Sequence, residues 1–359
     1  MLAFALAAAL TVPPACDLER PHGGPGCTRA AVDALPMNAV QAVGTHNSYK
    51  QAISPAEMAV LARTASQAAV TLDYAHPPLA AQLADGARQL ELDLFHDPEG
   101  GRYARPLGQS IPGATPYDLA AFRRPGLKVM HAQDIDYRSH CPLFTECLRQ
   151  IRAWSKANPD HLPLVVLLNL KEDDLAGVPG ATPAADFDAA AMAAIDREIR
   201  SVFGVAELIT PAQVRGRRPT LREAVAQGGW PRLGRARGRV MFALDASADQ
   251  VTRYRAALGR AGLAFLNVDE ADPDAAYITL NDPLAQAERI RRAVAAGLIV
   301  RTRADADTLE ARRDDPRRRG AALASGAQYV STDYMQADPR LGSYAVRLPG
   351  GVTARRRPE

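Results

Sequence analysis

Gly44-Thr45-His46-Asn47-Ser48-Tyr49 is the stretch that decides the fold of this 359-residue chain, because it ends a short apolar segment in polar side chains. Three later segments, residues 88–95, 126–131 and 163–171, have the same character. Successive strands that deliver polar side chains at their carboxyl ends are typical of a parallel barrel with its active site at one mouth. The candidate functional residues of these three segments are Glu91, Asp93, His131, Asn169 and Lys171.

The same alternation continues along the chain and predicts an α/β protein, a (β/α)8 TIM barrel. Strands are expected at 39–45, 88–95, 126–131, 163–171, 238–244, 263–269, 297–303 and 327–333. Helices are expected near 55–69, 77–87, 142–157, 186–202, 248–261, 284–296 and 305–325. The region 203–237 reads as an irregular excursion with one helix near 220–227. We therefore expect a single barrel domain over residues 28–349.

Composition narrows the class of partner. With 47% hydrophobic residues the chain can build a large core, and its net charge of +3 is too small to indicate a nucleic acid. The arginine-rich stretches 215–218, 312–319 and 355–357 are expected to be solvated surface, or else to touch anionic lipid. We expect a monomer.

Both chain ends are expected to lie outside the domain. Residues 1–15 resemble the apolar part of a signal peptide without its charged beginning, and a buried first helix is the alternative. Residues 350–359 are predicted to be a disordered tail. A signal peptide would make the protein secreted, into the periplasm or the medium.

Four cysteines lie as two local pairs, Cys16 with Cys27 and Cys141 with Cys147. Local pairing is the simplest of three arrangements and would agree with an oxidising compartment. Four free thiols in a cytosolic enzyme are the alternative.

The candidate site combines hard oxygen ligands with two histidines. Side chains on a strand alternate between its faces, so Glu91 and Asp93 share one face. With Asn47 they offer oxygen atoms that suit Ca²⁺ or Mg²⁺ rather than zinc. His46 and His131 remain for proton transfer. Each residue alone is as readily explained by structure, so the prediction rests on their order along the chain.

Further polar residues end the later strands: Asp245, Asn267, Asp269, Arg301, Arg303, Asp333 and Tyr334. Arginine at such a position suits a phosphate group. Lys171, Arg301 and Tyr334 are the candidate substrate-binding residues, and loop hydrogen bonds or ion pairs at the barrel rim are the alternative for each.

Thr45-His46-Asn47-Ser48-Tyr49, Glu91-Leu92-Asp93 and Val129-Met130-His131 together resemble the phosphoinositide-specific phospholipase C superfamily, and in particular its secreted bacterial Ca²⁺-dependent branch. The resemblance covers residues 38–175, with a looser echo at 297–335. It implies a TIM barrel that cleaves phosphatidylinositol-type lipids at a membrane or micelle surface, giving diacylglycerol and a cyclic inositol phosphate.

The resemblance also implies roles for individual residues. His46 and His131 match the two catalytic histidines, and Asn47, Glu91 and Asp93 match the calcium ligands. Glu91 would in addition help to deprotonate the inositol 2-hydroxyl. The family usually has a carboxylate on the fourth strand, where this chain has Asn169, with Glu172 as the neighbouring carboxylate. The loss of one charge would weaken metal binding.

Two other functions remain open at this point. A glycerophosphodiester phosphodiesterase or a sphingomyelinase-D-like enzyme would use a histidine and Glu-x-Asp on the same barrel. A secreted binding module that has lost its chemistry would keep the fold, and Asn169 is a mild indication of such a loss. Analysis of the reaction products separates a phospholipase C from the other phosphodiesterases. Calcium titration tests whether the protein is a binding module.

Overall fold

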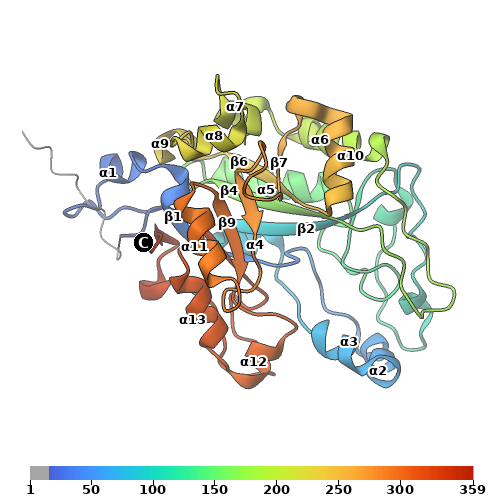
Figure 1. Ribbon diagram of the computed structural model, residues 1–359. Coiled ribbons are helices and arrows are strands. Elements are labelled where there is room, and N and C mark those ends of the chain that lie inside the picture. The colour runs from blue at the N-terminus through green and yellow to red at the C-terminus, as the bar shows by residue number, and fades with distance from the viewer. Residues whose placement is uncertain (1–15, 359) are drawn as a thin grey trace, which may run out of the picture.

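A computed structural model describes residues 16–358, so the leader predicted over residues 1–15 lies outside the described residues. Within them, a strongly curled parallel sheet forms the centre of the molecule, with helices around it (Figure 1). Its eight parallel strands are β1 (Val40–Thr45), β2 (Gln89–Phe95), β4 (Leu164–Leu170), β6 (Val240–Asp245), β7 (Ala264–Leu266), β8 (Tyr277–Thr279), β9 (Ile299–Arg303) and β10 (Tyr329–Thr332).

The ring of strands closes through one weak seam. Hydrogen-bonded pairing runs from β8 through β9, β10, β1, β2 and β4 to β6, and β7 pairs with β6. A single parallel bridge between Asn267 and Tyr277 joins β7 to β8. The predicted (β/α)8 barrel is therefore confirmed.

The helices lie along the connections between strands. They are α1 (Arg29–Asp33), α2 (Pro55–Thr64), α3 (Ser66–Thr71), α4 (Leu79–Ala84), α5 (Phe144–Ala157), α6 (Ala189–Val202), α7 (Pro211–Arg215), α8 (Leu221–Ala226), α9 (Leu233–Ala236), α10 (Ala248–Leu258), α11 (Ala287–Ala295), α12 (Leu309–Arg313) and α13 (Arg317–Ala324). The helix expected near 220–227 is α8, whereas the helices expected over 55–69 and 305–325 are each divided into two.

Side chains alternate between the two faces of a strand, and on β4 the two faces belong to different apolar clusters. The odd-numbered Val165 and Leu167 of β4 belong to a core cluster with Ile299 of β9 and Tyr329 of β10, far away in sequence. The even-numbered Val166 belongs to a second cluster that also contains side chains of α5 and α6. Gly44 permits close contact between β1 and β2, because a Cβ there would lie 2.5 Å from the carbonyl oxygen of Gln89.

The third predicted strand is wrong in extent and direction. Only Lys128–Val129 form a strand, β3, and it pairs antiparallel with β2. The eighth barrel strand is instead β8, which the sequence pattern does not reveal because it has only three residues and follows β7 without an intervening helix. His131 consequently comes from a loop rather than from the end of a barrel strand.

The last described part of the chain, near residue 355, is more regular than the sequence predicts. Ala354–Arg356 form β11, which pairs antiparallel with the first half of β1. The disordered tail predicted over 350–359 is therefore wrong for these residues. The excursion at 203–237 contains α7, α8, α9, the 3-10 turn η4 (Val205–Glu207) and β5 (Leu208–Ile209), which pairs with β6.

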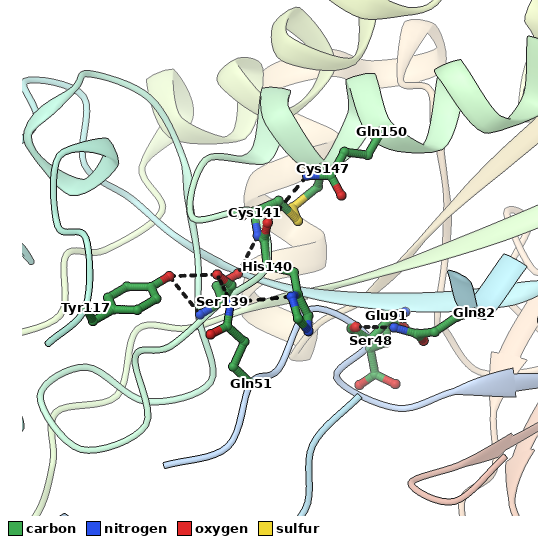
Figure 2. The surroundings of a disulfide bond; sticks show 10 residues. All are labelled: Ser48, Gln51, Gln82, Glu91, Tyr117, Ser139, His140, Cys141, Cys147 and Gln150. Atoms are coloured by element: carbon green, nitrogen blue, oxygen red, sulfur yellow. Dashed lines mark hydrogen bonds between the residues drawn. A yellow bond between two sulfur atoms is a disulfide. The ribbon is translucent and has the colours of Figure 1, made fainter. Parts of the chain in front are cut away.

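Both local disulfides are present. Cys16 is bonded to Cys27, and Cys141 is bonded to Cys147. Figure 2 shows the second bond beside α5, next to the loop that carries His140. The Nε2 atom of His140 lies 2.7 Å from the carbonyl oxygen of His76. This contact connects the loop that carries the disulfide to a segment beside the site described below. No helix in residues 16–358 is long and apolar enough to cross a bilayer.

Candidate active site

The carboxyl ends of neighbouring strands bring most of the predicted oxygen ligands to one mouth of the barrel. Asp93 on β2 lies in register with Asn169 on β4, which lies in register with Asp245 on β6. Asp93 and Glu91 are buried, and their side chains share one face of β2 because they are two residues apart on one strand. The register thus places carboxylate and amide oxygens on three adjacent strands in one layer.

His46 is held by a carboxylate from the opposite end of the sequence. Its Nδ1 atom lies 2.8 Å from Oδ1 of Asp333, just after β10, and Arg303 on β9 lies 3.0 Å from the other oxygen of Asp333. A carboxylate can only accept, so Nδ1 carries the proton and Nε2 keeps its lone pair. That Nε2 atom lies 3.9 Å from Oε1 of Glu91.

The surroundings keep His46 neutral near pH 7. Burial, together with the positive charge of Arg303, lowers the pKa of His46 to about 4. Burial opposes the charge of Asp333, but His46 and Arg303 outweigh it and lower the pKa of Asp333. A neutral imidazole with an unprotonated Nε2 can accept a proton, which is what a general base requires.

Two cations from other strands neutralise the acidic pair. Arg301 on β9 lies 2.6 Å from Oε2 of Glu91 and also contacts Asn281 and Ser331. Lys171 lies 3.0 Å from Oδ2 of Asp93, and this carboxylate outweighs burial and raises the pKa of Lys171.

Asn47 has left the strand conformation. Its φ of 46° is left-handed, a conformation that asparagine tolerates better than most residues. Its Nδ2 atom donates to the hydroxyl of Tyr74 at 2.8 Å, and this hydroxyl also lies 3.3 Å from Nδ1 of His46. One of the two N–H groups of the Asn47 amide is thereby used, and its carbonyl oxygen is the atom that could bind a cation.

His131 belongs to a second carboxylate–histidine pair. Its Nδ1 atom lies 2.9 Å from Oδ2 of Asp136, and the other oxygen of Asp136 lies 3.2 Å from Nζ of Lys50. Asp136 and Lys50 are fully buried, whereas the side chain of His131 keeps 23% of its surface exposed. As with His46, the carboxylate requires the proton on Nδ1 and leaves Nε2 free.

The residues at the mouth fit a divalent cation. Both oxygens of Asp93 are buried without a well-directed hydrogen bond, despite the nearby ammonium group of Lys171, which is unusual for a buried carboxylate. In residues 16–358, no three histidine, cysteine, aspartate or glutamate side chains gather closely enough to form a metal centre by themselves. A cation would therefore need amide oxygens as well, and Asn47 and Asn169 offer them.

Two predicted residues lie elsewhere. Tyr334 packs edge to face on Tyr344 within the outer core cluster, so its burial is explained by packing. Glu172 is held 2.6 Å from Arg253 of α10, which excludes it as the replacement for Asn169 at the mouth. Tyr74, Asp136 and Lys50 are not predicted by the strand pattern, because none of them ends a barrel strand.

Comparisons with known proteins show the family and the fold of the chain. The profile described as "Phosphoinositide phospholipase C, Ca2+-dependent" matches residues 35–358. A comparison with curated sequences gave no significant match. The fold is similar to that of a calcium-dependent phosphoinositol-specific phospholipase C from Pseudomonas sp., with a TM-score of 0.55 and 15% identity over 97% of this chain and 98% of that one.

A second structure, a Ca²⁺-dependent phosphatidylinositol-specific phospholipase C from Streptomyces antibioticus, is similar with a TM-score of 0.51 and 20% identity over 84% of this chain and 95% of that one. The match of the profile covers nearly the whole described chain, and the fold of the chain is similar to that of these enzymes. The chain belongs to the Ca²⁺-dependent phosphoinositide phospholipase C family, a family of phosphoric diester hydrolases.

Proposed function

We propose that this protein cleaves phosphatidylinositol-type lipids to diacylglycerol and a cyclic inositol phosphate. The observation that carries the proposal is the His46–Asp333 pair, whose unprotonated Nε2 atom lies beside Glu91 at the barrel mouth. Family membership favours this lipid class over the glycerophosphodiesters that the sequence left open.

The two histidines divide the proton transfers. His46 Nε2 accepts the proton of the inositol 2-hydroxyl, whose oxygen then forms a bond to phosphorus. The bond between phosphorus and the glycerol oxygen breaks, and His131, which must enter the step as the imidazolium with a proton on both nitrogens, gives the Nε2 proton to that leaving oxygen. Asp136 stabilises the protonated form of His131, and Asp333 stabilises the protonated form of His46 after the transfer.

The ligand set proposed for calcium is Asn47, Glu91, Asp93 and Asn169, with Mg²⁺ as the alternative ion. When bound, the ion stabilises negative charge on the phosphoryl group and lowers the pKa of a coordinated hydroxyl. Arg301 and Lys171, which neutralise Glu91 and Asp93, are the cations available to the substrate phosphate. Tyr334 is not part of this proposed site because it packs in the core.

We also propose that the protein acts outside the cytoplasm, on lipid at a membrane or micelle surface. Two disulfides are typical of an oxidising compartment.

Product analysis tests the reaction. Purified protein with Ca²⁺ should convert phosphatidylinositol into a cyclic phosphate visible by ³¹P NMR, and should leave glycerophosphocholine intact. His46→Ala and His131→Ala should abolish turnover with an unchanged circular dichroism spectrum, while the exposed His22→Ala serves as the control. Turnover of glycerophosphocholine alone would indicate the rival phosphodiesterase. Comparable rates in both histidine variants would remove them from the mechanism.

A further inference from the structure

One buried lysine touches the supports of both catalytic histidines. Lys50 follows the His46-Asn47 turn, and its side chain is fully buried. Its ammonium group donates to the carbonyl oxygens of Leu72 at 3.0 Å and Tyr74 at 2.9 Å. It also forms an ion pair with Asp136 at 3.2 Å. A third, longer hydrogen bond of 3.5 Å runs from the ammonium group to the carbonyl oxygen of Gln51.

On one side, Lys50 controls the support of His131. Asp136 is fully buried, and its two oxygens face Lys50 and His131. Burial raises the pKa of this carboxyl, but the charge of Lys50 and the hydrogen bond from His131 outweigh it and lower the pKa. The phenols of Tyr49 and Tyr74 also interact with Asp136, and burial raises the pKa of each well above its usual value, so both stay neutral.

On the other side, Lys50 fixes the aromatic ring that supports His46. Its Nζ atom lies 4.8 Å from the centre of the Tyr74 ring, in addition to its bond to the Tyr74 carbonyl. The Tyr74 hydroxyl contacts Asn47 and His46, and the ring stacks on the His46 imidazole with 6.1 Å between centroids. Both histidines therefore rest on groups that the same ammonium holds.

We propose that Lys50 is a positioning residue that ties the two histidines into one rigid unit, with the proton of each imidazole on Nδ1. Burying two charges is costly, and an apolar pair of similar volume is often equally stable, so stability alone does not explain Lys50 and Asp136. Orienting residues behind a functional histidine set its tautomer and ring direction. The catalytic role of Lys50 rests on the proposed function. Its contacts with Asp136 and Tyr74 are observed independently of that function.

Lys50→Met removes the charge with little change in volume. In ¹⁵N-histidine NMR of the full chain, the wild type should show His131 protonated on Nδ1 near neutral pH. The variant should show a mixture of His131 tautomers, because Asp136 loses one of the two groups that orient it. With phosphatidylinositol, kcat should fall about 10- to 100-fold with little change in KM.

Lys128→Met is the matched control. Lys128 is also fully buried, forms an ion pair with Asp97 at 3.2 Å and donates to two backbone carbonyls, but it contacts neither histidine support. It should lose stability as Lys50→Met does while the tautomer of His131 and kcat stay unchanged. Should Lys50→Met fail to fold, Asp136→Asn replaces it and should change the His131 tautomer with Lys50 in place.

A wild-type tautomer and wild-type kcat in folded Lys50→Met would overturn the proposal. So would equal effects in Lys50→Met and Lys128→Met, because these would reflect general loss of stability. If the wild type does not turn over any phosphoinositide, the proposed function fails instead, and the NMR comparison still decides the role of Lys50.

Discussion

At the scale of single residues, the site contains two histidines whose Nδ1 atoms each contact a carboxylate. Asp333 holds His46 and Asp136 holds His131, with Nδ1 to oxygen distances of 2.8 and 2.9 Å. Such a carboxylate orients the ring and stabilises the imidazolium that forms during proton transfer. The sequence named both histidines, but it did not pair either one with its carboxylate.

Asp333→Asn should lower kcat about 10²- to 10⁴-fold, because an amide can donate to Nδ1 and favour the wrong tautomer. KM for phosphatidylinositol should change little, and steady-state kinetics measure both. Asp338→Asn, beyond the pair on the same loop and bound to Arg340, is the control. Wild-type kcat in Asp333→Asn would show that the pair has no part in turnover.

Glu91→Gln should weaken calcium binding and turnover together, since it removes one charged ligand from the proposed set. It should also lower the free energy of unfolding by about 3 kcal/mol, because Arg301 is left buried without its ion pair. Isothermal titration with Ca²⁺ and urea denaturation measure the two effects. The exposed Glu288→Gln is the control. Unchanged calcium affinity would remove Glu91 from the ligands.

At the scale of elements, ion pairs hold the irregular excursion at 203–237 to a neighbouring helix. Glu207 of η4 forms ion pairs with Arg152 at 3.0 Å and Lys156 at 2.8 Å, both on α5, and accepts from the backbone of Gly204. Burial raises the pKa of this carboxyl, but its hydrogen bonds to Lys156 and Arg152 outweigh burial and lower it to about 2. The irregular excursion is thus fastened to α5.

Glu207→Gln should lower the free energy of unfolding at pH 7 by about 1 kcal/mol, a figure reduced for solvent screening. Because the folded-state pKa is depressed, the contribution is present above pH 4.5 and is lost as the pH falls through about 2. Urea denaturation at pH 7 and pH 3 should show the difference shrinking. Exposed Glu223→Gln should match the wild type at both values. A pH-independent difference would contradict the ionic origin.

At the scale of the whole molecule, calcium should stabilise the fold, because the proposed ligands come from segments that are assembled only in the native state. Ca²⁺ at 100 times its dissociation constant should add about 2.7 kcal/mol to the free energy of unfolding. Differential scanning calorimetry should show a higher Tm with Ca²⁺, a return to the starting value with EDTA and a smaller rise with Mg²⁺. Asp93→Asn should lose most of the shift. Equal shifts in Asp93→Asn and wild type would place the ion elsewhere.

The sequence by itself determined the order of most barrel strands and which of them end in polar residues. Periodicity and strand parity are local properties, so they are enough to assign Glu91 and Asp93 to one face of their strand, and Asn169 and Lys171 to one face of theirs. Local patterns fail where an element is short. The three residues of β8 and of β11 are too few to show a period.

Only the tertiary structure decided which charges meet. His46 and Asp333 are 287 residues apart, and Glu91 and Arg301 are 210 apart, so their contacts arise from closing the ring of strands. In the folded chain Tyr334 packs on Tyr344 and Glu172 pairs with Arg253, so neither belongs to the proposed site. Lys50 lies against Asp136. Packing makes these choices because a buried charge must find its partner from whichever strand lies beside it.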